Sequence, residues 1–109
     1  MRFTDIIQEW FRDELGGSLM LPDGWYGRPY GSQFSLTSVA ESGDTLTLVL
    51  QKKLTLHFTG LRAVERRNRD LVLGPFDRLR FEWESFGDDG SHGVKGYQSG
   101  EARIVAAPG

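Results

Sequence analysis

The sequence contains no cysteine. This absence excludes disulfide scaffolds, thiolate zinc sites, iron–sulfur clusters and cysteine nucleophiles, and it is compatible with a reducing compartment. The chain also has no long apolar run at its start, because acidic side chains interrupt the segment MRFTDIIQEWF. We therefore expect neither a signal peptide nor a membrane span, and we infer a cytoplasmic protein.

Motifs of the common catalytic classes are also missing. There is no G-x-S-x-G elbow of a serine hydrolase and no glycine-rich phosphate loop before a helix. Glu82 and Glu84 share one strand face and resemble a glycosidase pair, but they alternate with Arg78 and Arg80, which would keep both acids ionised. We therefore expect no catalytic residue, and the chain is not predicted to be an enzyme.

The two histidines are isolated in the sequence. His57 falls on the polar face of a strand, and His92 falls in a glycine-rich loop over residues 87–93. Neither histidine has a partner at metal-ligand spacing, and Asp88 and Asp89 lack the fixed oxygen pattern of a calcium loop. We expect no metal and no cofactor.

The net charge of −2 is unevenly distributed. Residues 1–51 carry three basic and seven acidic side chains, residues 52–80 carry eight and three, and residues 81–109 carry two and five. A basic middle segment suits either a nucleic-acid surface or strands that attract acidic neighbours. Acids interrupt the four arginines of residues 62–69 and no aromatic residue is interleaved, so we favour the structural interpretation over nucleic-acid binding.

The first fifteen residues predict an amphipathic helix over residues 5–15. Apolar side chains recur there at three- and four-residue steps, with charged side chains on the other face. Thr4 is the expected N-cap, and Asp5 suits the positive end of the helix dipole. Gly16 with Gly17 is the expected left-handed stop.

Residues 18–106 have the alternation and turn signals of a β-meander. The clearest segment is 46–58, where apolar side chains occupy the even positions. It predicts a hairpin that pairs Leu50 with Leu54, Leu48 with Leu56 and Leu46 with Phe58, around the loop Gln51–Lys53. Further strands are expected at residues 33–40, 61–65, 71–73 and 78–84, with Gly74-Pro75 ending the third of these, and a last hairpin is expected from 94–98 and 101–106.

These elements predict a single α+β domain over residues 1–109. Its length allows one core that buries roughly two thirds of the unfolded surface. The N-terminal helix is expected to pack on a curled, mostly antiparallel meandering sheet, or a small barrel, of six to eight strands, because no strand–helix–strand alternation is present.

The segment Gly24–Gly31 is the most unusual of the chain. It places Trp25, Tyr26, Arg28 and Tyr30 among glycines, and rings with arginine are the residue types that dominate binding hot spots. The structural alternative is that the rings close the end of the sheet while Arg28 satisfies buried carbonyls or an acid. The candidate binding residues are Trp25, Tyr26, Arg28, Tyr30 and His92.

The run from Leu21 to Tyr30, with Gly43–Leu46 and Phe81-Glu82-Trp83, resembles small uncharacterised bacterial proteins. These share a Gly-Trp-x-Gly-Arg-Pro loop before a β-meander, and the likeness covers roughly residues 20–86. The resemblance implies a bacterial cytoplasmic protein. It implies no activity and transfers no catalytic residue.

Two functions from different classes follow. The first is a non-catalytic binding module that presents the Trp25–Tyr30 loop to a protein partner or to a second copy of itself, since unpaired edge strands make homodimers accessible. The second is a small-molecule-binding domain or minor enzyme, with a pocket lined by Phe81, Trp83 and Tyr97 and with Arg28 at its mouth.

Overall fold

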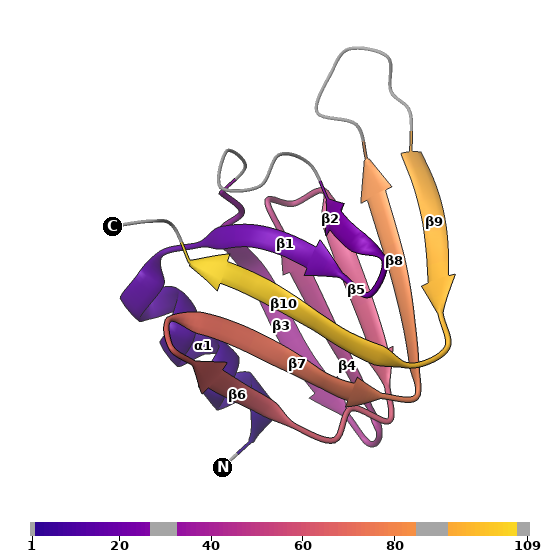
Figure 1. Cartoon of the computed structure of the whole chain (residues 1–109), viewed down its shortest axis with the longest axis horizontal. Helices are drawn as coiled ribbons and strands as arrows, with labels where there is room; N and C mark the ends of the chain where they lie inside the picture. Colours follow the sequence, from indigo (N-terminus) through magenta and orange to yellow (C-terminus); the bar gives the residue numbers. More distant parts are fainter. Residues whose placement is uncertain (1, 27–32, 85–91, 107–109) are drawn as a thin grey trace.

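The residues that the structure describes form two five-stranded antiparallel sheets with one helix packed on them (Figure 1). The computed structural model describes residues 2–26, 33–84 and 92–106. Helix α1 spans Phe3–Glu14. Sheet A has the strand order β2-β1-β10-β7-β6, with β1 Gly17–Leu21, β2 Gly24–Tyr26, β6 Val64–Arg67, β7 Asp70–Phe76 and β10 Gly100–Ala106. Sheet B has the order β3-β4-β5-β8-β9, with β3 Leu36–Ser42, β4 Thr45–Leu50, β5 Leu54–Thr59, β8 Arg78–Glu84 and β9 His92–Tyr97.

The predicted α+β class is confirmed, but the single curled sheet or barrel of six to eight strands is wrong. The described residues form ten strands divided between two sheets. Two of the additional strands, β1 and β2, lie where the sequence has a short apolar piece and a glycine-rich segment without alternation. Their pairing comes from the Pro22-Asp23 turn, which sets Leu21 opposite Gly24.

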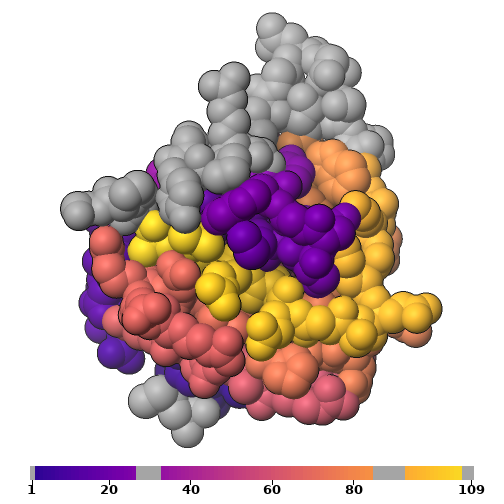
Figure 2. Space-filling model, viewed as in Figure 1, coloured from indigo at the N-terminus to yellow at the C-terminus, as the bar shows by residue number. Residues whose placement is uncertain are grey.

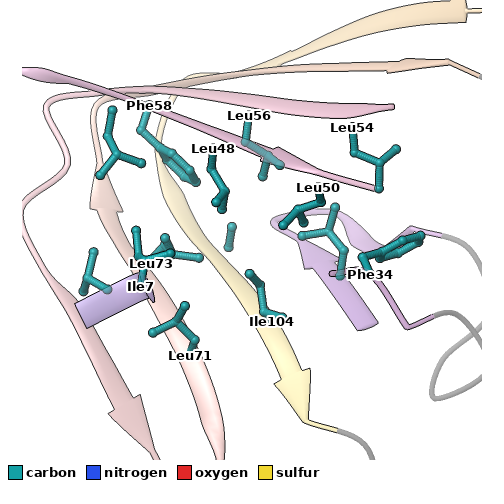
Figure 3. Packing of buried hydrophobic residues seen from close by; sticks show 14 of the residues in the cluster. Ile7, Phe34, Leu48, Leu50, Leu54, Leu56, Phe58, Leu71, Leu73 and Ile104 are labelled. Atoms are coloured by element: carbon teal, nitrogen blue, oxygen red, sulfur yellow. The ribbon is translucent and has the colours of Figure 1, made fainter. Parts of the chain in front are cut away.

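The hairpin of β4 and β5 has the predicted register. Leu46 pairs with Phe58, Leu48 with Leu56 and Leu50 with Leu54, around residues 51–53. All six side chains are buried, and the five that Figure 3 labels point towards Leu71, Leu73 and Ile104 of sheet A. The core therefore lies between the two sheets, as period-two burial requires.

Helix α1 begins and ends differently from the prediction. Its N-cap is Arg2, which makes no side-chain cap, and Thr4 lies inside the helix. The backbone N–H of Thr4 donates instead to Glu41 Oε1 of β3 at 2.8 Å, so a distant carboxylate satisfies a free donor of the first turn. The left-handed residue at the end is Leu15, at φ 66°, and not Gly16.

Helix α1 packs against β3 of sheet B and β6 of sheet A. The indole Nε1 of Trp10 donates to the carbonyl of Arg69 at 2.9 Å, next to β6. Arg66 pairs with Asp13 at 2.7 Å and Arg69 with Glu14 at 2.9 Å. Basic side chains of the middle segment therefore pair with acidic side chains of the helix, whereas the charge pattern predicted pairing between adjacent strands of a sheet.

Strand β7 continues through Gly74-Pro75, so the expected break there is wrong. Gly74 has φ +150°, and its N–H donates to Ala63 O at 2.9 Å. Opposite it, the register with β10 shifts between Gly100 and Ala102. This register shift accommodates Gly74 and Pro75, so that the pairing of β7 with β10 continues on both sides of them.

The predicted last hairpin is also wrong, since β9 pairs with β8 in sheet B while β10 pairs with β1 and β7 in sheet A. The connection at Ser99 crosses from one sheet to the other. His92 and Gly93 belong to β9 and not to the expected polar loop, whose residues 87–91 lie outside the described part. Among the described residues, no helix is long and apolar enough to cross a bilayer.

Candidate functional site

An open cavity of about 240 Å³ lies where β2 of sheet A approaches β8 and β9 of sheet B. In the space-filling view the violet surface of β1 and β2 borders the orange and yellow surface of β8 and β9 (Figure 2). We call this cavity the aromatic cleft; it is lined by Leu21, Asp23, Gly24, Trp25, Tyr26, Phe81, Trp83, Lys95 and Tyr97.

Three packed rings form the inner wall of the aromatic cleft. Tyr26 contacts Phe81 edge to face, with centroids 5.0 Å apart, and Phe81 stacks on Trp83 at 5.5 Å. Trp83 also lies across Gly93, where an added Cβ would be only 2.3 Å from its ring. Phe81 is buried, whereas Tyr26 and Trp83 are half-buried and keep part of their surface available.

The two neighbouring aromatic residues of β2 point to opposite faces. Tyr26 pairs with Leu19, which is fully buried, whereas Trp25 pairs with Met20. Because side chains alternate along a strand, Tyr26 faces the core while the side chain of Trp25 lies on the outer face of β2.

A polar cluster lies at the rim of the aromatic cleft. The hydroxyl of Tyr97 donates to Asp23 Oδ1 at 2.8 Å, and the ammonium of Lys95 donates to Asp23 Oδ2. The same ammonium lies 5.6 Å from the centroid of the Tyr97 ring. The turn before β2 is thereby tied to β9, so the two sheets are joined at this side as well as through α1.

The shifted pKa values of the aromatic cleft all move away from neutral pH. Hydrogen bonds from Lys95 and Tyr97 lower the pKa of Asp23. Burial and the hydrogen bond to Asp23 raise the pKa of Tyr97, and burial raises the pKa of Tyr26. Asp23 is therefore an ionised acceptor and both phenols are neutral, an arrangement that suits binding better than proton transfer.

Because its folded pKa is raised, Tyr97 contributes stability that is fully present below pH ~10 and is lost as the pH rises through the folded value. We expect wild type to lose more stability than Tyr97→Phe in alkaline solution, since only wild type must ionise this hydroxyl beside Asp23. Urea unfolding at neutral and alkaline pH, with absorbance titration of the phenols, measures the difference. If wild type and Tyr97→Phe lost the same amount of stability between neutral and alkaline pH, the raised pKa of Tyr97 would be contradicted.

The structure brings together only part of the predicted site. Phe81, Trp83 and Tyr97, predicted as one pocket, do line the same cavity, and Tyr26 joins them from the other sheet. Trp25 is also among the residues that line the cavity, although its side chain points to the opposite face of β2 from that of Tyr26. The backbone of His92 begins β9, but its side chain is not described.

Arg28 and Tyr30, and with them the expected mouth of the pocket, lie outside the described residues. Sequence reasoning missed Asp23 and Lys95. Asp23 carries only a turn signal, and Lys95 is one charged residue in a short strand, so no pattern links two residues 72 positions apart.

Comparison of the chain with protein-family models, curated proteins and solved structures finds no match of any of the three kinds. The resemblance to bacterial proteins with a Gly-Trp-x-Gly-Arg-Pro loop therefore stays a prediction. Any functional assignment must rest on the geometry of the aromatic cleft.

Proposed function

We propose that the chain is a non-catalytic binding module whose site is the aromatic cleft. The observation that carries the proposal is the convergence of Tyr26, Trp83 and Tyr97, from three strands and both sheets, on one open cavity. Large rings with one polar end dominate binding interfaces, because they bury much area at little cost in side-chain entropy. Here Phe81 and Gly93 hold Trp83 in place before any ligand arrives.

The size of the cavity favours a protein partner. At about 240 Å³ it is smaller than the pockets of drug-sized ligands, which hold about 300–1,000 Å³. It has room for one ring-sized side chain. The alternative, a small-molecule-binding domain, is supported by the same rings and would require a correspondingly small ligand.

The polar cluster at the rim of the aromatic cleft indicates which kind of aromatic side chain of a partner would bind best. Asp23 accepts one hydrogen bond from Tyr97 and one from Lys95. A carboxylate has about four acceptor positions, so it can accept a further donor. A partner ring that carries its own N–H or O–H, such as the indole of tryptophan, would satisfy both the aromatic wall and this acceptor.

Titration of the ¹⁵N-labelled protein with N-acetyl-tryptophanamide tests this function by chemical-shift changes. We expect weak, saturable binding with shifts concentrated at Tyr26, Trp83 and Gly93. Tyr97→Thr should weaken binding by about fivefold, because one aromatic pair contributes about 1 kcal/mol beyond its buried area.

Two controls accompany the titration. N-acetyl-leucinamide, which has no ring or side-chain donor, should bind more weakly than the tryptophan probe. Glu9→Ala, on the exposed face of α1, should leave the binding unchanged. Equal shifts with both probes, or shifts unaffected by Tyr97→Thr, would argue against the aromatic cleft as the site.

A further inference from the structure

Strand β9 is an open edge of sheet B (Figure 1). Among the described residues four strands lie at sheet edges, and α1 packs against two of them, β3 and β6. The third, β2, has only three residues. Strand β9 has six, and no described strand pairs with its outer side.

Two backbone hydrogen bonds identify the groups of β9 that point outward. Gly60 N–H donates to Asp44 O at 2.8 Å, and Glu84 N–H donates to Lys53 O at 2.9 Å. In an antiparallel ladder, hydrogen-bonded and non-hydrogen-bonded pairs alternate along each strand. The first bond continues the β4–β5 register and shows that the even residues of β5 bond to β4, which leaves its odd residues to bond to β8. The second bond continues the β5–β8 register and shows that the even residues of β8 bond to these odd residues of β5.

The odd residues of β8 therefore bond to β9, through its residues 93, 95 and 97. It follows that His92, Val94 and Gly96 direct their backbone N–H and C=O groups away from the sheet.

This edge carries little of the protection that edge strands usually have. Proline, outward charges and bulges discourage pairing elsewhere. In β9, Val94 is 54% exposed, and an added Cβ at Gly96 would meet no atom of the described residues within 4 Å. The single charged side chain of known position, Lys95, is turned towards Asp23.

We propose that β9 pairs antiparallel with β9 of a second copy of the chain, about a two-fold axis at Val94. The proposal does not depend on what the aromatic cleft binds. It would join the two B sheets into one continuous sheet, with each Val94 opposite its counterpart. Every outward N–H and C=O of His92, Val94 and Gly96 would then have a partner.

Strand β9 is complementary to itself in antiparallel pairing. This favours a second copy of the chain as the partner and determines the register in which the two strands pair. A continuous sheet must keep inner side chains opposite inner side chains, so the axis passes through a residue and not between two. An axis at Lys95 would set two like charges directly opposite each other. An axis at Val94 instead sets Lys95 opposite Gly93 of the second copy and buries the exposed valine against itself.

A six-residue strand pair is smaller than a standard protein interface, which buries about 1,600 Å². The dimer should therefore be concentration-dependent. Sedimentation of wild type across the micromolar to millimolar range should show a shift from monomer to dimer mass.

Val94→Cys provides the decisive test, because the chain has no other cysteine. Residues in a hydrogen-bonded antiparallel pair have Cα atoms about 5.5 Å apart, within the range that a disulfide spans. Under mild oxidation Val94→Cys should form a covalent dimer about tenfold faster than Lys95→Cys, because pairing raises the effective concentration of facing thiols. Lys95→Cys is the matched control, on the same strand but off the axis.

A second pair of variants separates pairing from folding. Gly96→Pro removes an outward N–H while leaving the bonds to β8 in place, and Gly96→Ala keeps that N–H. Dimerisation should be lost in the first and kept in the second. Equal cross-linking of the two cysteine variants, a monomer throughout the concentration range, or a monomer that pairs only with foreign peptides would each overturn the proposal.

Discussion

Trp10→Ala is expected to lower the free energy of unfolding by about 3–5 kcal/mol, the largest effect of any single substitution considered for this protein. Trp10 is fully buried in α1 and packs edge to face on Phe11, with centroids 4.9 Å apart. Its Nε1 also donates to the carbonyl of Arg69 at 2.9 Å. Truncation removes core volume and leaves that carbonyl without its donor, at the point where the helix meets β6.

Urea unfolding followed by circular dichroism measures this loss. Trp10→Phe keeps a ring but not the donor, and it should cost about 0.5–1.5 kcal/mol, the net contribution of one hydrogen bond, because the carbonyl of the exposed Arg69 can bind water instead. Glu9→Ala, exposed on the same helix, should stay within about 0.5 kcal/mol of wild type. If Trp10→Ala were as mild as Glu9→Ala, α1 would not pack as the structure describes.

Gly16→Ala is expected to destabilise the fold by about 2–4 kcal/mol, from left-handed strain and overpacking together. Gly16 has φ +146°, and an added Cβ would lie 2.6 Å from the carbonyl oxygen of Phe34. The backbones on both sides are held, because Gly17 N–H donates to Phe34 O at 3.1 Å and Phe34 N–H donates to Gly17 O at 2.8 Å. Neither segment can move without losing these bonds.

Gly43→Ala is the matched control for Gly16→Ala. Gly43 has φ +60°, but an added Cβ would meet no atom within 4 Å in the part of the chain that the structure describes. Its substitution should therefore carry only the cost of a left-handed residue, about 1–2 kcal/mol. Thermal unfolding of both variants compares the two effects, and equal losses would show that the close approach to Phe34 does not matter.

Gly16 also illustrates a prediction that named the right residue for the wrong reason. The sequence places it where a helix stop is expected, yet Leu15 adopts the left-handed conformation that ends α1. Glycine is required at position 16, the next residue, because the backbone of Phe34, 18 positions away, leaves no room for a side chain there. A stop signal and a close tertiary approach call for the same residue type, and sequence cannot separate them.

The candidate site divides in a similar way. The rings of Phe81 and Trp83 share a predicted strand face, so their proximity follows from period-two alternation. Their contact with Tyr26 needs two sheets to meet, and the bond between Lys95 and Asp23 needs β9 and the turn before β2 to lie at the same rim. No local pattern reports either condition.

Local periodicity determined the amphipathic helix, the facing of β4, β5 and β8, and the register of the β4–β5 hairpin, because a one-residue slip would expose every leucine of a strand. Tertiary structure decided the division into two sheets, the continuation of β7 through Gly74-Pro75, and the separation of β9 from β10. Alternation specifies which face of a strand is buried but carries no information about which strand lies beside it. Partner choice depends on contacts between residues far apart in the chain, and those contacts also create the aromatic cleft and leave the edge of β9 open.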